Sequence, residues 1–370
     1  MKHKISRILV TITCLILLSG CWDEKLIKET RFILSAAYDK NDNDKIIGTY
    51  STPNDAVYPQ SSIITTVKGD TVREITLRIN DKVAETLDTS KLKVVFFGEK
   101  LAKEDGLYPY LDIFIREPNN PINPYLVIVK GDAKSYFSNP IPNESEPSEY
   151  FRELLLAHVD KGVLPNVNLL KGSRIFENRG FDILVPYITT SPDKTPKIDG
   201  LAIMDEDKFT GETLSMQESI LFNSLKRSIV KYQPNLVIKL RDNEQPKIEG
   251  YITINLLESK RKTKVNIKNG KATADIKLNI KVEVIESPKM NVKKNREFIT
   301  NKMEKQLTKE VNTIIKKLQK ANCDGLAIGQ QLHSFHNEEY EKLNWKDEAY
   351  KNADIKAKVK IEIVKHGLVD

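Results

Sequence analysis

The feature that most constrains this chain lies in its first 21 residues. Lys2, Lys4 and Arg7 precede an eleven-residue, largely apolar run, Ile8–Leu18, and the run leads into Leu18-Ser19-Gly20-Cys21. A basic start, a short apolar run and small residues before a cysteine are typical of a bacterial lipoprotein signal. A membrane-spanning helix needs about 20 apolar residues, so this run is too short to be one. The segment therefore predicts export and removal rather than a place in the fold.

We expect cleavage between Gly20 and Cys21, with a diacylglyceryl group on the Cys21 sulfur and an acyl group on its amino nitrogen. Palmitate-like acyl chains contribute about 0.8 kcal/mol for each buried methylene, and more than one chain makes attachment lasting. The alternatives are an ordinary secreted protein or an uncleaved anchor, in which Cys21 has no special role. The prediction places the body on the extracytoplasmic face of a membrane.

The cysteine count limits how the body is stabilised. Cys14 leaves with the signal and Cys21 carries lipid, so Cys323 remains alone and no disulfide forms within the mature chain. The fold must then rely on hydrophobic cores, which a chain of this length can supply in two or three domains. Removing the three basic residues of the signal lowers the formal net charge from +7 to +4, which gives no argument for nucleic acid.

Hydrophobic periodicity predicts a multi-domain α+β protein, with three domains of mixed or antiparallel sheets covered by helices. The C-terminal domain combines alternating strands, the turn Asn269-Gly270 and a long helix over Asn295–Lys320 that packs on an antiparallel sheet. Other predicted elements are a helix over 71–87, a buried strand over 92–97, a helix or turn over 107–115, a helix or strand over 181–188, a hairpin over 199–214, a helix over 215–230, and strands over 236–240, 247–257, 262–267, 272–285 and 355–364.

The loop Thr189–Lys197, rich in Ser, Pro, Asp and Lys, is interpreted as the first domain boundary. The predicted organisation is a signal peptide over 1–20, a lipidated tether over 21–32, an N-terminal domain over 33–190, a middle segment over 197–235 and a C-terminal α+β domain over 236–370.

The sharpest candidate for chemistry is a possible metal site near the C-terminus. Cys323, His333 and His336 stand close in sequence to Glu338 and Glu339, and these residue types bind zinc. Their spacing matches no zinc pattern, so Cys323 is interpreted as a small buried residue at a helix end and the histidines as part of a polar loop. The chain also lacks the Gly-x-Ser-x-Gly motif of serine hydrolases, and its glycines do not have the spacing of a loop that binds phosphate. We therefore expect no enzyme, no metal and no cofactor.

The long helix region 292–320 carries nine Lys or Arg residues against three Glu. A basic face of this kind suits anionic lipid headgroups. The plainer interpretation is a solvated face opposite a packed stripe formed by Ile299, Met303, Leu307, Val311, Ile314 and Leu318. Aromatic residues are not interleaved with these charges, which argues against a nucleic-acid groove.

Ordered blocks of sequence resemble one known family. They comprise Cys21-Trp22-Asp23, the segment Thr71–Ala102, the segments Leu111–Glu117 and Tyr125–Gly131, the segment Gly200–Leu225, and a C-terminal block formed by Cys323–Gln330, Trp345 and Ile355–Gly367. In this order and spacing they are similar to the Ger(x)C lipoproteins, the C subunits of spore germinant receptors.

The resemblance implies a lipid-anchored, non-enzymatic subunit on the outer face of the spore inner membrane. It also implies partnership with integral-membrane A and B subunits, a role in nutrient-triggered germination, and a three-domain α+β fold. The rival hypothesis is a solute-binding lipoprotein of an ABC-type transporter. That class needs two lobes of alternating βαβ units around a cleft, whereas the second half of this chain is predicted to be strands followed by a helix.

Overall fold

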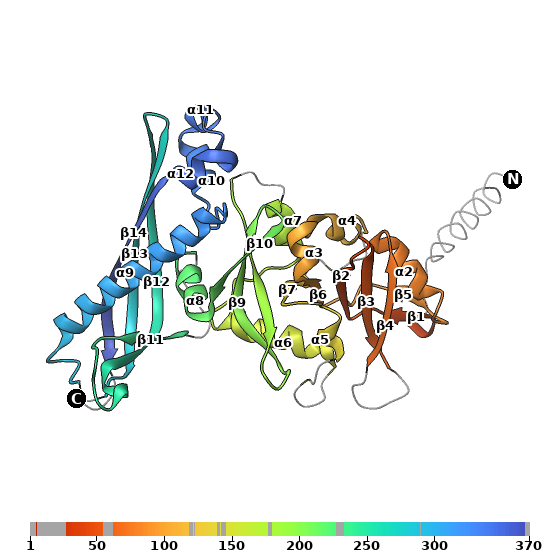
Figure 1. Cartoon of the computed structure of the whole chain (residues 1–370), viewed down its shortest axis with the longest axis horizontal. Helices are drawn as coiled ribbons and strands as arrows, with labels where there is room; N and C mark the ends of the chain where they lie inside the picture. Colours follow the sequence, from red (N-terminus) through yellow and green to blue (C-terminus); the bar gives the residue numbers. More distant parts are fainter. Residues whose placement is uncertain are drawn as a thin grey trace.

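The protein has an elongated body, seen in a computed structural model that describes residues 5, 27–54, 62–117, 121, 123–138, 141, 146–176, 180–226, 233–288 and 290–366 (Figure 1). An eight-stranded sheet organises the N-terminal body, residues 27–225, and a four-stranded sheet organises the C-terminal body, residues 233–366. The predicted α+β class is confirmed. No helix among the described residues has the length and apolar character needed to cross a membrane.

The eight-stranded sheet has the order β10-β9-β8-β7-β6-β2-β3-β4. Its middle strands β2, β6, β7 and β8 run parallel, and antiparallel strands complete both sides. A separate parallel pair is formed by β1 and β5. The strands are β1 (Thr30–Phe32), β2 (Ser35–Lys40), β3 (Ile46–Pro53), β4 (Ser62–Gly69), β5 (Thr86–Asp88), β6 (Val94–Gly98), β7 (Tyr125–Val129), β8 (Leu184–Thr190), β9 (Pro196–Asp205) and β10 (Lys208–Ser215).

Helices cover both faces of this sheet, which explains why its central strands are continuous apolar runs. On strand β6, Val94 and Phe96 join one buried cluster with α5, α6 and α8, while Val95 and Phe97 join a second cluster with α2, α3, α4 and α7. The helices are η1 (Ile27–Glu29), α2 (Val72–Asn80), α3 (Glu99–Glu104), α4 (Tyr108–Arg116), α5 (Ser135–Ser138), α6 (Pro147–Asp160), α7 (Leu169–Phe176) and α8 (Met216–Ser224).

Helix α2 begins where the sequence predicts and ends seven residues early. The Thr71 hydroxyl accepts a hydrogen bond from the Glu74 N–H and caps the start. The helix stops at Asn80, and Leu87 lies instead in β5 beside β1. The Asn80 side chain accepts a hydrogen bond from the Leu87 N–H, and this bond stabilises the loop that leads from the end of α2 into β5. The apolar spacing of Val83 and Leu87 therefore continued a helical pattern that the backbone does not follow.

The loop Thr189–Lys197 connects two paired strands of one sheet. Strand β8 pairs with β9 across it, and the predicted hairpin over 199–214 is present as β9 and β10. The middle segment predicted over 197–235 thus adds its strands to the N-terminal sheet. The division into three domains stays a prediction.

The C-terminal sheet has the order β11-β12-β13-β14, with helix α9 packed along one face. The stripe predicted for this helix is buried throughout, and Asn269-Gly270 forms the turn between β12 and β13. The elements are β11 (Asn235–Lys239), η3 (Lys247–Gly250), β12 (Tyr251–Lys268), β13 (Lys271–Glu286), α9 (Arg296–Lys320), α10 (Ile328–Phe335), α11 (Asn337–Tyr340), η4 (Trp345–Ala349), α12 (Tyr350–Asn352) and β14 (Asp354–His366).

Two expectations for this sheet are wrong. The segments predicted as separate strands over 247–257 and 262–267 are the short helix η3 and the single long strand β12. The sheet is also not wholly antiparallel, because β14 pairs parallel to β13. The physical reason is the connection: α9 carries the chain back to the starting end of β13, and a strand that returns after such a crossover runs parallel.

Helix α9 also closes the outer edge of strand β14. Glu304, Thr308 and Asn312 are spaced four residues apart on the helix, so they share one face. Their side-chain oxygens accept hydrogen bonds at 3.0 Å from the N–H groups of Ile361, Val359 and Ala357, respectively. The Asn312 amide also donates to the Ala357 carbonyl at 2.8 Å. The helix thus satisfies an edge that would otherwise be open to pairing with another strand.

Asn312→Ala tests this edge closure. The substitution leaves both backbone polar groups of Ala357 without their partners, so we expect the free energy of unfolding to fall by about 2 kcal/mol. Thr313→Ala is the control, because the exposed Thr313 hydroxyl bonds only to its own helix, at the Lys309 carbonyl, and we expect a change below about 0.5 kcal/mol. Urea unfolding measures both, and equal stabilities for the two variants would contradict the edge account.

Candidate functional site

The residue predicted to carry the lipid, Cys21, and the cleavage site after Gly20 lie outside the described residues. The signal peptide 1–20 lies there too, apart from Ile5. The lipid site therefore stays a prediction from the sequence.

The residues weighed as a metal site do not come together. Cys323 is fully buried just after α9, as the plainer interpretation expected, with its sulfur 3.9 Å from the Ile183 carbonyl oxygen. His333 lies exposed on helix α10 rather than on a loop, and its ring faces Tyr340 and Glu341. His336 is half-buried, and Glu338 and Glu339 are exposed. Among the described residues, no three His, Cys, Asp or Glu side chains are placed to hold a metal ion.

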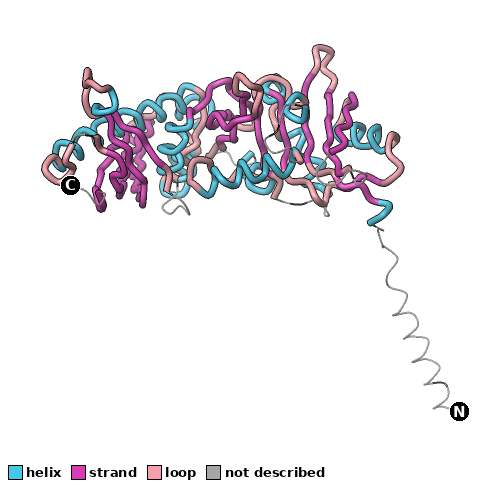
Figure 2. The backbone as a smooth tube through the Cα atoms, turned by 90° about the horizontal axis from the view of Figure 1, so that it is seen from below, coloured by secondary structure: helices cyan, strands magenta, loops and turns pink. Residues whose placement is uncertain are grey.

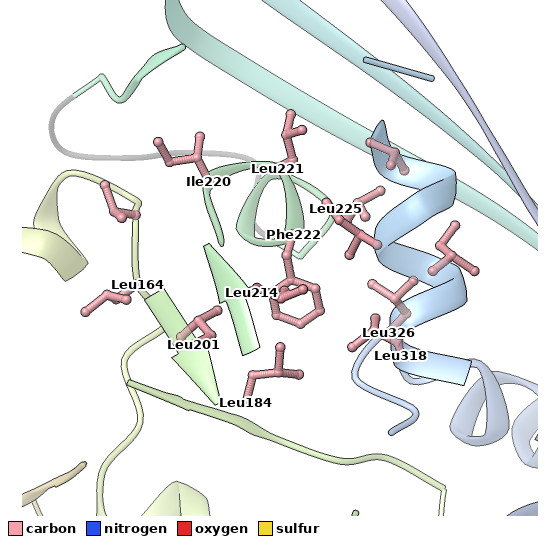
Figure 3. Packing of buried hydrophobic residues seen from close by; sticks show 14 of the residues in the cluster. Leu164, Leu184, Leu201, Leu214, Ile220, Leu221, Phe222, Leu225, Leu318 and Leu326 are labelled. Atoms are coloured by element: carbon pink, nitrogen blue, oxygen red, sulfur yellow. The ribbon is translucent and has the colours of Figure 1, made fainter. Parts of the chain in front are cut away.

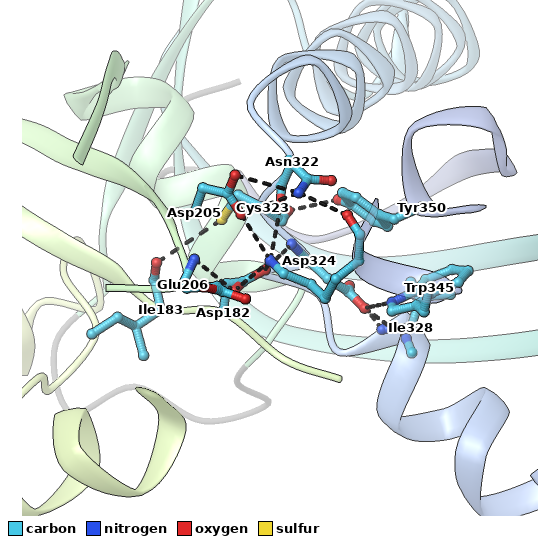
Figure 4. A network of polar contacts seen from close by, with 12 residues as sticks. Asp182, Ile183, Asp205, Glu206, Asn322, Cys323, Asp324, Ile328, Trp345 and Tyr350 are labelled. Atoms are coloured by element: carbon cyan, nitrogen blue, oxygen red, sulfur yellow. Dashed lines mark hydrogen bonds and ion pairs between the residues drawn. The ribbon is translucent and has the colours of Figure 1, made fainter. Parts of the chain in front are cut away.

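A buried polar cluster joins the N-terminal body to the C-terminal body, and we call it the joint (Figure 4). The Lys346 ammonium nitrogen, on η4, lies 2.9 Å from Asp182 Oδ2 and 3.0 Å from Asp205 Oδ1. Asp182 precedes β8 and Asp205 ends β9, so both carboxylates come from the eight-stranded sheet. The same ammonium donates to the Asn322 carbonyl at 3.1 Å, and the Asn322 amide donates to Asp205. One lysine thus contacts both bodies.

Asp324 anchors the C-terminal side of the joint. Its carboxylate accepts hydrogen bonds from the Ile328 N–H at 2.9 Å, the Gly329 N–H at 2.6 Å and the Trp345 indole N–H at 3.1 Å. Its own N–H donates to Asp182 Oδ2 at 2.6 Å. Gly329 is required here, because an added Cβ would lie 2.2 Å from the Trp345 indole nitrogen. The loop after α9 is thereby fixed against both the tryptophan and the N-terminal sheet.

Apolar side chains of both bodies pack together beside the joint, where a Cβ added to Gly325 would lie 2.6 Å from Leu184 and 3.3 Å from Phe222. Figure 3 shows this packing. Leu184 of β8, Phe222 and Leu225 of α8, and Leu318 and Leu326 of the C-terminal body belong to one buried cluster. Helix α8 is also tied to α9 by an ion pair in which Lys317 Nζ lies 2.7 Å from Glu218 Oε1. The contact between the bodies therefore combines an apolar cluster with ion pairs.

Burial controls the charges of the joint. It raises the pKa of the Asp324 carboxyl to about 6, although the N–H donors of Gly329 and Ile328 act in the opposite direction. Burial also raises the pKa of Asp182, opposed by Lys346. For Lys346, burial disfavours the charge, but the two carboxylates outweigh it and its pKa is raised. Burial raises the pKa of the Cys323 thiol well above its ordinary value, which makes the thiol a poor nucleophile.

A groove of about 890 Å³ lies beside the joint. It is lined by both bodies, with Arg174 and Glu206 on one side and His333, Tyr340 and Asp347 on the other. Charges of both signs are mixed along it. Among its described lining residues, His333 faces Glu341, and the Ser334 hydroxyl donates to the Gln330 carbonyl of its own helix. The arrangement is suited to holding two bodies in one orientation.

The joint could not be predicted from local sequence patterns. Asp182 and Lys346 are 164 residues apart, and acidic and basic residues are common on any surface. The one local signal is the sequence Asp324-Gly325, next to a cysteine that was expected to be buried.

Lys346→Met tests the joint. It leaves Asp182 buried without its counter-charge, so we expect the free energy of unfolding to fall by about 3 kcal/mol. The double variant Asp182→Asn with Lys346→Met removes the stranded charge and is expected to recover part of that loss. Lys100→Met, which breaks an exposed pair with Asp42, should cost less than about 1 kcal/mol. Urea unfolding followed by the fluorescence of Trp345 measures all three. A Lys346→Met variant as stable as the unchanged protein would contradict the account.

Comparisons with known proteins match almost the whole chain. Residues 23–190 match the family described as the spore germination protein N-terminal domain, and residues 199–367 match the spore germination B3/GerAC-like C-terminal family. Spore germination protein B3 of Bacillus subtilis (strain 168) is 25% identical over 98% of this chain and 98% of its own. Spore germination protein GerQC of Bacillus cereus is 22% identical over 96% and 97%.

The fold has a counterpart among solved structures. The crystal structure of the GerBC protein aligns with a TM-score of 0.60 at 20% identity and covers 89% of this chain and 97% of its own. The two family matches follow one another in the order that the sequence blocks predicted. The chain therefore belongs to the Ger(x)C family of spore germination proteins.

Proposed function

We propose that this protein is the lipid-anchored, non-catalytic C subunit of a nutrient germinant receptor. The observation that carries the proposal is the succession of a lipoprotein cleavage motif and two spore-germination domains over residues 23–367. The subunit is held by Cys21 on the outer face of the spore inner membrane. There it works with integral-membrane A and B subunits to start germination in response to nutrients.

The arrangement of the body supports a role in binding rather than catalysis. At the joint, the Lys346 ammonium and the carboxylates of Asp182 and Asp324 all have hydrogen-bond partners, and burial raises the pKa of the Cys323 thiol well above its ordinary value. The rival solute-binding class is not favoured, because the described part of the second half forms one sheet on one long helix instead of a second βαβ lobe. A thermal-shift screen with amino acids, sugars and nucleosides separates the two, since a tight soluble ligand would favour the rival.

Cys21→Ala, introduced at the native locus, tests the anchor and its role together. Without the acyl chains, we expect the membrane-bound fraction of the protein to fall roughly tenfold or more. The rate of nutrient-triggered germination should fall with it. Membrane fractionation with immunoblotting measures the first effect, and loss of spore refractility after nutrient addition measures the second.

Cys323→Ala is the matched control, because it removes the other cysteine of the mature chain from a buried position. It should leave both the membrane fraction and the nutrient response close to those of the unchanged protein. A Cys21→Ala protein that still fractionates with membranes after a high-salt wash, which removes electrostatic attachment, would show that the lipid is not the means of attachment. Normal germination with a fully released protein would contradict the receptor role.

A further inference from the structure

The four-stranded sheet has a second face, opposite α9, on which lysines are aligned across strands. Lys262 of β12 lies directly opposite Lys277 of β13, and Lys277 lies opposite Lys358 of β14. These three residues form one row of cross-strand neighbours. In the row on one side of it, Asn279 of β13 lies between Lys260 of β12 and Lys360 of β14, and in the row on the other side, Asp275 of β13 lies between Lys264 of β12 and Lys356 of β14. All seven lysines are exposed, and together they are called the lysine face: Lys260, Lys262, Lys264, Lys277, Lys356, Lys358 and Lys360.

Most of this charge is not neutralised within the described chain. Asp275 is the one acidic residue in the three rows. Lys260, Lys356 and Lys360 pair with acidic side chains at the margins of the face. The central residues Lys262, Lys264, Lys277 and Lys358 have no ion pair among the described residues. A concentrated positive field therefore remains at the middle of the sheet.

The alignment of lysines across the strands lowers the stability of the sheet. Like charges directly opposite one another on neighbouring strands are destabilising, and lysine is depleted in strands. Lysines often protect the edge of a sheet from pairing with another strand, but α9 already closes the edge at β14. In the described part of the chain the other edge is open, because β11 pairs only with residues 251–255 of β12, so Lys260, Lys262 and Lys264 also protect that edge. Edge protection does not account for Lys277 on the inner strand β13, or for the three lysines of β14.

The orientation of the face relates it to the predicted anchor. In Figure 2, α9 lies above the four-stranded sheet, and the sheet's other face is turned downward, to the side on which η1 lies at the opposite end of the body. Cys21 precedes Ile27, the first residue of η1, by six residues, which span at most about 20 Å. A membrane that holds Cys21 is thus close to η1, and the lysine face is turned to that side.

We propose that the lysine face rests on anionic lipid headgroups of the membrane in which Cys21 is anchored. This inference builds on the lipid attachment in the proposed function. The face contains lysine and no arginine, and lysine acts as a hydrated point charge rather than as a bidentate fork for one carboxylate. Such charges suit a flat, anionic lipid surface, because the binding free energies of the individual basic residues add up there. The lipid holds one end of the elongated body and the lysine face holds the other, so the body lies along the membrane.

The test uses the full mature chain with Cys21→Ala, so that lipidation plays no part. Binding is measured by co-sedimentation with vesicles of phosphatidylglycerol and phosphatidylcholine in equal amounts, and with vesicles of phosphatidylcholine alone. We expect binding to the anionic vesicles only, weakening as salt is raised. The triple variant Lys262→Gln, Lys277→Gln and Lys358→Gln should bind on the order of a hundredfold more weakly. It should fold as stably as the parent, because it removes like-charge repulsion.

The matched control is the triple variant Lys302→Gln, Lys305→Gln and Lys309→Gln. It removes the same charge from exposed positions on α9, on the opposite side of the sheet. Because those lysines face away from the membrane, this variant should retain vesicle binding within about threefold.

Equal losses in the two triple variants would show that net charge, not this face, drives binding, and would overturn the proposal. Equal binding of the unchanged protein to neutral and anionic vesicles would overturn it too. If the Lys262, Lys277 and Lys358 triple binds vesicles normally but fails to recover membrane proteins from spores, the face binds an acidic protein instead. None of these results bears on the germination test of Cys21→Ala, so failure here is distinct from failure of the proposed function.

Discussion

The pairing of Lys346 with Asp182 and Asp205 is the interaction on which the arrangement of the molecule depends. A buried carboxylate such as Asp182, 3% exposed, is tolerated only where a counter-charge and hydrogen-bond donors meet it. The Glu206 N–H of its own body supplies one donor. The counter-charge of Lys346 and the Asp324 N–H come from the other body, so Asp182 is fully paired in one relative orientation of the two sheets. The apolar cluster around them supplies stabilisation that is less directional. The joint, together with an apolar cluster that continues across the contact, therefore makes the two bodies one elongated unit.

This rigidity gives the surfaces of the protein a defined relation to one another. The lysine face and the first described helix, η1, lie at opposite ends and on one side of the body. If the bodies turned freely, that relation would have no meaning for attachment to a membrane. A receptor subunit that is anchored at one end and oriented by a fixed body can present the same surface to its membrane partners each time.

Much of the fold could be predicted where one hydrophobic period runs long enough. Helix α9, strand β13 and the Asn269-Gly270 turn are local patterns, and the structure has them as expected. The end of α2 at Asn80 could not be read from periodicity, because the spacing of Val83 and Leu87 continues beyond it. The parallel pairing of β14 depends on the crossover through α9, which alternation within a strand does not reveal. The joint and the lysine face form only when segments that are distant in the sequence are brought together in one register. Their charged residues are of common types, so nothing in the local sequence predicts that they meet. The family, in contrast, followed from the order of several short blocks.

The most direct test of the account is purification of the intact protein, with an affinity tag at its C-terminus, from detergent-solubilised spore membranes. The account predicts that two integral-membrane proteins, the A and B subunits of one receptor, are recovered with it in comparable amounts. It also predicts that they are absent when the tagged protein carries Cys21→Ala. Recovery of the protein alone, or together with the membrane components of a solute transporter, would contradict the claim that it is a germinant-receptor subunit.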